Sequence, residues 1–252
     1  MKIASLLFKP KWQDKNPQVR RLAVANEHDG ELIAALSLIA RTDADAGVRV
    51  AALRRLADYE AWRERSTGDA DGEVRRVARE AYLALLCSSA PTLPSLARRI
   101  AELDTLSPVE IERVVSRATD RDLRAAALPH ISRRALLADR ALNDPDAVLR
   151  AGLVDRIDDV TALERIAEAA RKTDKLVSRR ARDRAAALRI GAGNSDAIAA
   201  RAQSLCIRVE AQLRGGNTDE VASQQIEREW DKLGTGVPAD ILARFQGALA
   251  VL

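Results

Sequence analysis

A short motif recurs along this chain. It consists of an acidic residue, a Val-Arg or Leu-Arg pair a few positions later, and then small apolar residues. The Val or Leu of successive copies falls at positions 19, 48, 74, 123 and 149, so the steps are 29, 26, 49 and 26 residues. The step of 49 is close to two shorter steps, and a looser copy begins at Asp174. A period in this range is typical of stacked helical units, each of which needs its neighbours to bury its apolar face.

The hydrophobic pattern between these copies has the period of an amphipathic helix. Leu32, Ile33, Leu36 and Ile39 mark one apolar face, and no segment alternates convincingly with a period of two. Short runs rich in Gly, Ser, Asp and Asn separate the helical segments. The sequence therefore predicts an all-α protein, specifically a right-handed α-solenoid of helical hairpins.

Five hairpins and two less regular regions are expected. The hairpins pair residues 2–9 with 17–26, 30–40 with 46–58, 59–66 with 72–87, 132–142 with 145–157, and 159–170 with 174–190. Three segments at 93–103, 107–117 and 120–128 make one unit irregular. Longer helices are expected near 195–214, 218–233 and 238–251. The predicted domains are a repeat array over 1–190 and a C-terminal helical extension over 191–252 that stacks on it.

The repeated Asp…Val-Arg…Ala pattern, over about residues 5–190, resembles the HEAT-repeat family, including its short-repeat relatives in phycobilisome lyases and bacterial scaffolds. The resemblance implies a ladder in which the Asp of one unit meets an Arg of the same or the adjacent unit. The Asp can also cap the second helix, where exposed N–H groups and the helix dipole favour a carboxylate. We expect the repeat arginines to be structural, namely Arg20, Arg49, Arg75, Arg124 and Arg150.

A narrower similarity concerns the segments FKPKWQDKNPQVR, DYEAWRERS, RKTDKLVSRRARDR, EREWDKL and ILARF. They look like the N-terminal region of large bacterial proteins that form a domain-of-unknown-function family, in which helical repeats precede long coiled-coil-like repeats. The chain ends inside an apolar pattern, although a terminal repeat should present a polar outer face. We therefore expect the natural polypeptide to continue beyond Leu252.

Composition points to a protein that is neither secreted nor embedded in a membrane. The formal net charge of +4 comes from 41 Lys and Arg against 37 Asp and Glu, which predicts an evenly mixed surface. Cys87 and Cys206 lie in apolar helical stretches, outside any CxxC pair, so we expect reduced core cysteines. No segment has the features of a signal peptide or a membrane span. We expect a soluble, cytoplasmic protein.

The common signatures of enzymes are absent from the sequence. It contains no HExxH, paired CxxC, GxSxG, GxGxxG or P-loop motif, and its two histidines, His28 and His130, are far apart. We therefore expect no catalysis, no metal site and no small-molecule cofactor.

The steepest local charge bias lies at residues 171–189, where eight basic residues accompany two acidic ones. If the helix buries Val177, Ala181 and Ala185, Arg180 and Arg184 lie on one side of it and Arg182 on the other. The resemblance implies that this helix lines a concave surface. A solvated face offset by nearby acids is the plain alternative. The candidate binding residues are Lys172, Lys175, Arg179, Arg180, Arg182 and Arg184, and Arg133, Arg134, Arg140 and Arg165 would extend the patch.

The leading functional hypothesis is a non-catalytic scaffold that presents its concave surface to a protein partner. Binding of nucleic acid through phosphate contacts is the second. The third is a resemblance to HEAT-like alkyl-purine DNA glycosylases, which use Trp, Asp and Arg on a basic concave face and would make Trp12 and Trp62 candidates. Core or end-cap packing is the plain alternative for both tryptophans. Trp230 and Phe245 are expected to pack the last helices together.

Overall fold

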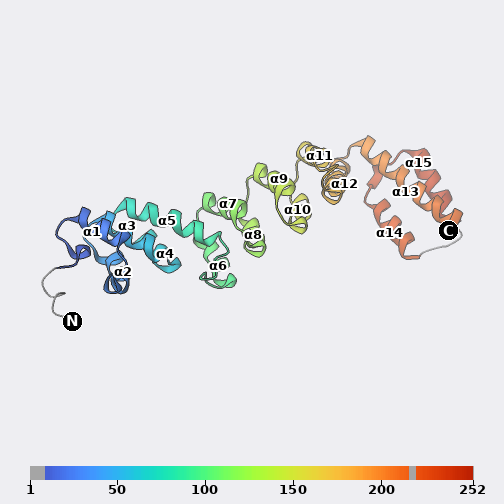
Figure 1. Cartoon of the computed structure of the whole chain (residues 1–252). Helices are drawn as coiled ribbons and strands as arrows, with labels where there is room; N and C mark the ends of the chain where they lie inside the picture. The colour runs from blue at the N-terminus through green and yellow to red at the C-terminus, as the bar shows by residue number, and fades with distance from the viewer. Residues whose placement is uncertain (1–8, 216–219, 252) are drawn as a thin grey trace. The chain divides into compact units, whose positions relative to one another are not determined.

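The computed structural model describes residues 9–215 and 220–251, and within these ranges the chain forms fifteen α-helices and no β-strand. The predicted all-α class is confirmed. The contacts divide the chain into two compact units, Met1–Ile131 and Ser132–Leu252. The first unit contains α1 to α8 and the second contains α9 to α15 (Figure 1).

The first unit is built largely of consecutive antiparallel pairs. Its helices are α1 (Pro17–Asn26), α2 (Gly30–Thr42), α3 (Ala46–Leu56), α4 (Tyr59–Gly68), α5 (Gly72–Leu86), α6 (Leu96–Ala101), α7 (Pro108–Arg117) and α8 (Arg121–Ala127). α2 packs against α3 and α4 packs against α5, as predicted. α1, α3 and α5 contact one another in succession and α2 contacts α4, which gives two layers of helices. The helix predicted at 2–9 lies outside the described residues.

The long step between Val74 and Leu123 contains one hairpin and one extra short helix, not two hairpins. α7 pairs with α8 and also contacts α5, so these helices continue the stacking. The extra element is α6, which has six residues and is followed by a 3-10 turn at Glu102–Thr105. Pro91 and Pro94 lie in the loop before it, and the helix begins after Ser95, whose hydroxyl accepts the Arg98 N–H at 3.4 Å.

The second unit begins with two further hairpins. Its helices are α9 (Arg134–Asn143), α10 (Ala147–Val154), α11 (Val160–Ala169), α12 (Lys175–Gly191), α13 (Ser195–Gly215), α14 (Glu220–Asp231) and α15 (Ala239–Leu249). α9 contacts α11 and α10 contacts α12, again in two layers. α10 starts two residues later than predicted because Asp146 is its N-cap. The predicted boundary at 190/191 falls within this unit, since α12 packs against α13.

The last three helices share a core of their own. Trp230 of α14 stacks on Phe245 of α15 with ring centroids 3.7 Å apart, so their predicted packing is confirmed. Cys206 is buried in this core and Cys87 in the first unit, and both are free thiols, as expected. Only α13, with 21 residues, is longer than the repeat helices. The three helices expected near 195–214, 218–233 and 238–251 are present as α13, α14 and α15, and a 3-10 turn at Gly234–Gly236 lies between the last two.

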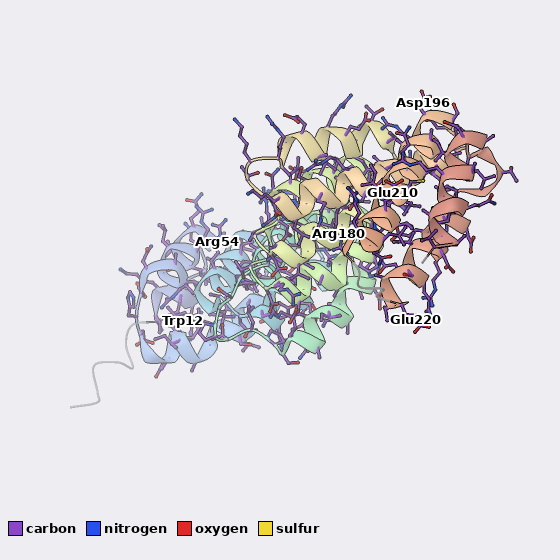
Figure 2. The ribbon with its side chains drawn as sticks, turned by 90° about the vertical axis from the view of Figure 1, so that its right-hand side faces the viewer. Trp12, Arg54, Arg180, Asp196, Glu210 and Glu220 are labelled. Atoms are coloured by element: carbon purple, nitrogen blue, oxygen red, sulfur yellow. The ribbon has the colours of Figure 1, made fainter. Side chains whose placement is uncertain are left out.

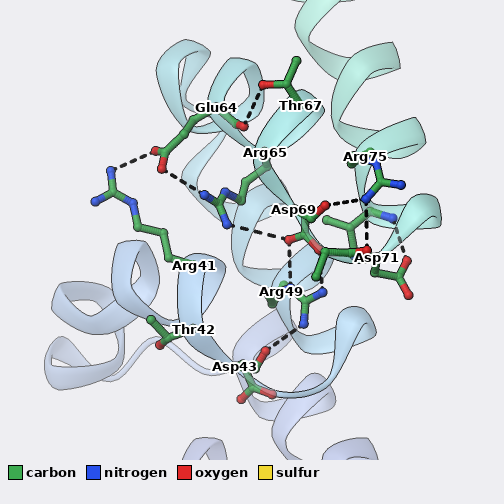
Figure 3. Close-up of polar contacts among 12 residues, drawn as sticks. Arg41, Thr42, Asp43, Arg49, Glu64, Arg65, Thr67, Asp69, Asp71 and Arg75 are labelled. Atoms are coloured by element: carbon green, nitrogen blue, oxygen red, sulfur yellow. Dashed lines mark hydrogen bonds and ion pairs between the residues drawn. The ribbon is translucent and has the colours of Figure 1, made fainter.

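The copies of the repeat motif at 43–45 and 69–71 contain two aspartates, two residues apart, with separate tasks. The second acid, such as Asp45, caps the following helix by accepting the Val48 N–H at 3.0 Å. The first acid, Asp43, accepts two hydrogen bonds from Arg20 of the preceding unit, from Nε at 2.9 Å and Nη2 at 2.8 Å. Asp69 receives the same pair of bonds from Arg49, at 2.9 and 2.6 Å. Figure 3 shows Arg49 between Asp69 and the Asp43 turn.

Each of these arginines also closes the turn of its own unit. Arg49 Nη1 donates to the Asp43 carbonyl at 2.8 Å, and Arg20 Nη1 donates to the Asp14 carbonyl at 2.9 Å. In the second unit Arg150 Nη1 donates to the Asp144 carbonyl at 2.7 Å, and its Nε donates to Asp174 at 2.9 Å. Arg75 and Arg124 likewise donate to carbonyls of their own turns, so all five arginines expected to be structural are engaged by the fold. We call the three that also bind the aspartate of the next unit the ladder arginines: Arg20, Arg49 and Arg150.

The ladder changes where the repeat is interrupted. Arg75 still donates to its own turn, at the Asp69 carbonyl, but α6 intervenes and Arg99 takes the acid of the next unit, Asp120, at 2.9 Å. In the sixth copy the arginine is replaced by Ser178, whose hydroxyl donates to the Ala167 carbonyl at 2.7 Å. The ladder contact is therefore not extended beyond Asp174 by this motif.

The ladder carboxylates Asp69, which is buried, and Asp43, which is half-buried, remain ionised. Burial acts to raise the pKa of Asp43 and of Asp69, but the hydrogen bonds from Arg20 and Arg49 and from backbone N–H groups outweigh it. The net pKa of each carboxyl is lowered. Removing one partner would leave the other charge buried and unpaired.

We predict that Arg49→Ala lowers the free energy of unfolding of the first unit by about 3 kcal/mol, since Asp69 loses its two hydrogen bonds. In a Trp230→Phe background both remaining tryptophans, Trp12 and Trp62, lie in the first unit, so their fluorescence in urea follows that unit. The matched control is Arg76→Ala, whose exposed pair with Glu73 is expected to change the value by less than about 0.5 kcal/mol. Equal effects of the two substitutions would contradict the ladder.

Candidate binding surfaces

The predicted basic residues of α12 point in different directions. Arg180 pairs with Asp155 at 3.4 Å, and Arg184 Nε donates to the Ile157 carbonyl at 3.4 Å, so both face the connection between α10 and α11 (Arg180 is labelled in Figure 2). Arg189 pairs with Glu164 of α11. These contacts follow the predicted placement of Arg180 and Arg184 on one side of the helix.

The remaining basic groups line one open hollow. We call it the α12 patch, and it consists of Arg171, Lys175, Arg179 and Arg182 with the side chain of Leu176. Lys175 and Arg179 are exposed and have no ion pair within the described part of the chain, and the same holds for Lys172, which precedes the helix. The patch therefore contains a subset of the predicted binding residues.

The predicted extension of this patch is not seen. Arg134 pairs with Asp158 at 3.3 Å, and Arg140 pairs with its neighbour Asp139 at 2.7 Å. Neither these two nor Arg133 and Arg165 line the hollow. Their charges were indistinguishable in the sequence from those of α12, because a linear pattern does not say which acid each arginine meets.

A second surface lies in the first unit, across three neighbouring helices of one layer. We call it the α1–α3–α5 groove. Its floor is formed by small and medium apolar residues, and its border by charged ones. The floor residues are Leu22, Ala25, Gly47, Val50, Ala51 and Val77, and the border residues include Arg21, Arg54, Arg55 and Glu73.

The four charged residues of the border differ in whether they have hydrogen-bond or ion-pair partners within the protein. Arg55 donates to the Val24 carbonyl at 2.9 Å and so caps the C-terminal end of α1. Glu73 accepts two hydrogen bonds from Arg76. Arg21 and Arg54 are exposed and have no acidic partner among the described residues (Arg54 is labelled in Figure 2). The groove thus offers two available guanidinium groups beside an apolar floor.

Gly47 allows Arg21 to lie close over the groove. A Cβ at this position would stand 3.3 Å from Cδ of Arg21 and 3.1 Å from Oδ1 of Asp45. Both distances are shorter than ordinary van der Waals contacts, so a larger residue would push the Arg21 side chain away. The glycine therefore affects where this cation lies.

Sequence reasoning did not identify this groove, although a signal was present. Arg-Arg doublets occur at 20–21, 54–55, 75–76, 98–99, 133–134 and 179–180, and three of them divide their two arginines in the same way. In the doublets at 20–21, 54–55 and 179–180 one arginine is engaged by the fold, through the ladder, a helix end or an ion pair. The other is exposed without an acidic partner in the described chain, and these are Arg21, Arg54 and Arg179. Adjacent residues on a helix point about 100° apart, so a doublet on a packed helix can serve both purposes.

A polar cluster in the first unit makes its contacts within the protein and is not a candidate binding site. The hydroxyl groups of Tyr59 and Tyr82 both donate to Oε2 of Glu102, a residue only 5% exposed, and Arg63 Nε stands 3.1 Å from its Oε1. Burial and the hydrogen bond to Glu102 raise the pKa of Tyr82 to about 12. The cluster joins α4 and α5 to the turn after α6, so its role is to hold these elements.

Arg79 adds a link from this cluster to α7. Its Nε and Nη2 donate to Glu110 at 2.6 and 2.9 Å, and its guanidinium lies 5.4 Å from the Tyr82 ring centroid. Glu110 also accepts the Ser107 N–H, which completes the N-terminal capping of α7. The hydrogen bonds from Arg79, followed by those from Ser107, outweigh burial and lower the pKa of Glu110 to about 2.

The two tryptophans of the glycosylase-like hypothesis lie in different surroundings. Trp62 is 4% exposed and belongs to the core, so it cannot stack on a base. The indole Nε1 of Trp12 has no hydrogen-bond partner, carboxylate or other, among the described residues. Within the same residues no three metal-ligating side chains gather, and no helix is both long and apolar enough to span a membrane.

Comparison with known proteins does not assign the chain to a family. No family model matches the sequence, no curated protein is significantly similar to it, and no solved structure resembles it significantly. The resemblance to HEAT repeats therefore stays a prediction.

We predict that Glu110 contributes to stability at neutral pH and that this contribution disappears in acid. Its folded pKa, about 2, lies below the ordinary value of 4.5, so the contribution is complete above about pH 4.5 and is lost as pH falls toward 2. Thermal unfolding of Glu110→Gln should begin at a lower temperature than the wild type at pH 7.

The difference between the two midpoints should shrink between pH 5 and pH 3, because unfolded Glu110 takes up a proton in this range whereas folded Glu110 does so only near pH 2. Glu31→Gln, which removes an exposed carboxylate of α2, is the control and should give no such trend. A gap that stays constant from pH 7 to pH 3 would show that the Arg79–Glu110 pair is not responsible.

Proposed function

We propose that this protein is a non-catalytic binding module that holds an acidic segment of a partner protein in the α1–α3–α5 groove. The observation that carries the proposal is the pairing of an apolar floor with two arginines, Arg21 and Arg54, that no acid of the described chain neutralises. The ladder arginines, in contrast, are committed to the fold.

Each part of the groove has a task in such binding. The floor, with Leu22 60% exposed at its edge, can remove apolar side chains of a partner from water, at roughly 25 cal/mol per Å². Arginine forks can take carboxylates with two parallel hydrogen bonds, which adds orientation and specificity. The partner segment should therefore carry Asp or Glu on both sides of small apolar residues.

The proposal includes the architecture and the setting of the protein. The two-layer stacking within each unit supports a right-handed, HEAT-like α-solenoid, and repeats of this kind commonly bind partners along extended surfaces. The two free, buried cysteines support a reducing compartment, and we place the protein in the cytoplasm of a bacterium.

Peptide display tests the proposal directly. Selection of random 12-residue peptides on the full chain should enrich sequences with Asp or Glu flanking Leu, Val or Ala. The charge-reversed variant Arg21→Glu/Arg54→Glu should lose these peptides, with at least a tenfold weaker Kd, and should select Lys or Arg at the same positions. Anisotropy of the labelled peptides measures the affinities.

Arg228→Glu/Lys232→Glu is the matched control, because it reverses two exposed charges of α14 and the turn after it, both outside the groove. It should retain the original peptides. If no acidic pattern is enriched, or if both variants bind the selected peptides equally, the groove is not the binding site.

A further inference from the structure

We propose that the α12 patch is a second binding site, which takes the phosphate backbone of double-stranded nucleic acid without preference for sequence. The site lies in the second unit and involves none of the groove residues, so it does not depend on the function proposed above. The proposal rests on the geometry of four cations, on the engagement of the nearby acids, and on the absence of an apolar floor.

The cations of the patch form a stripe along α12. Lys175, Arg179 and Arg182 are spaced by four and three residues and therefore lie on one side of the helix. With a rise of 1.5 Å per residue, the stripe is about 10 Å long. Phosphates of one strand recur about every 3.4 Å along a duplex axis, so the stripe and Arg171 can reach three or four of them.

The acids near the patch neutralise only part of its charge. Asp174 accepts hydrogen bonds from Arg150, and Glu168 pairs with Arg171, which keeps part of that guanidinium at the edge of the patch. Asp183, one turn after Arg179, is exposed and is the one further acid on this helix. The local charge of the patch is therefore positive.

Arg182 is held in place where the ladder is interrupted. Its Nε lies 3.3 Å from the Ser178 carbonyl and its Nη2 lies 3.2 Å from the Ser178 hydroxyl. An arginine at position 178 would fill this space with its own side chain. The change from Arg to Ser in the sixth copy thus orients a cation toward the surface.

Phosphate backbones fit this surface better than a protein segment does. Leu176, 46% exposed, is the one large apolar side chain that lines the hollow, so a protein partner would find little apolar area to bury. Binding to phosphates instead draws on release of counterions and needs no apolar contact. No aromatic side chain lines the hollow for stacking on unpaired bases, which favours a duplex over a single strand.

The test is fluorescence anisotropy of a labelled 20-base-pair duplex titrated with the full chain at 25 to 200 mM salt. Binding should weaken with salt with a log–log slope of about −3, at about −0.9 per phosphate. In Lys175→Gln/Arg179→Gln/Arg182→Gln the affinity at 50 mM salt should fall at least tenfold and most of the slope should disappear. Two unrelated duplex sequences should bind equally.

The control Arg180→Gln/Arg228→Gln/Lys232→Gln removes the same number of charges from the second unit but none from the patch, and it should bind the duplex like the wild type. A second variant, Lys172→Gln/Lys175→Gln/Arg179→Gln, removes two patch cations and the adjacent Lys172 but leaves the Ser178 contacts intact. Its circular dichroism should match the wild type while its duplex affinity falls at least tenfold.

Several outcomes would overturn the proposal. Equal loss in the patch and control variants would mean that binding follows net charge alone. A flat salt dependence, or tighter binding of phosphatidylserine vesicles or of a poly-glutamate peptide than of the duplex, would remove nucleic acid as the ligand. The substitutions Arg21→Glu/Arg54→Glu lie in the other unit, so this variant should bind the duplex like the wild type. Failure of the groove proposal can therefore be distinguished from failure of the α12 patch proposal.

Discussion

The stacking of the repeat units depends on a single arginine that holds two turns at once. A guanidinium has five N–H donors in a rigid plane, and each ladder arginine divides them between the next unit's aspartate and the carbonyls of its own turn. A buried ion pair stabilises a fold only if its hydrogen bonds are nearly all made. Here the aspartate also accepts a backbone N–H, as Asp43 does from Asp45, so both partners are well satisfied.

This interaction decides which charges remain for other purposes. A ladder arginine cannot turn toward a ligand without breaking the contact between units, whereas an exposed arginine next to an engaged one stays available for binding. Arg20 and Arg21 illustrate the division, since the first holds Asp43 and the second borders the groove. Both proposed sites lie beside such doublets. In the α12 patch the replacement of the ladder arginine by Ser178 adds a further oriented cation.

The helices and their starts were largely predictable from the sequence, because caps and helical periodicity are local. Asn16 and Pro17 begin α1, and Ser107, Pro108 and Glu110 begin α7, as the capping patterns indicate. The Arg–Asp contacts between units were harder to predict. The sequence pattern drew attention to the capping Asp45 but not to Asp43, whose partner Arg20 is 23 residues away.

The sites were less predictable, because availability of a charge depends on tertiary neighbours. The cluster on α12 was identified, yet the sequence did not separate Arg179 from Arg180, one of which pairs with Asp155. The groove was missed because Ala25, Gly47 and Ala51 look like packing residues in any helical repeat. Their exposure to a groove follows from three helices lying side by side, which no local pattern records.

Hydrogen exchange at arginine side chains tests most directly whether the ladder arginines are held by the fold while Arg21, Arg54 and Arg179 are free to bind a ligand. In NMR spectra of the full chain, the Nε–H protons of Arg20, Arg49 and Arg150 should exchange slowly with solvent, because each donates to a partly or fully buried aspartate. Those of Arg21, Arg54 and Arg179 should exchange as fast as in a free arginine. Equal protection of the two groups, or fast exchange at Arg49, would contradict the account.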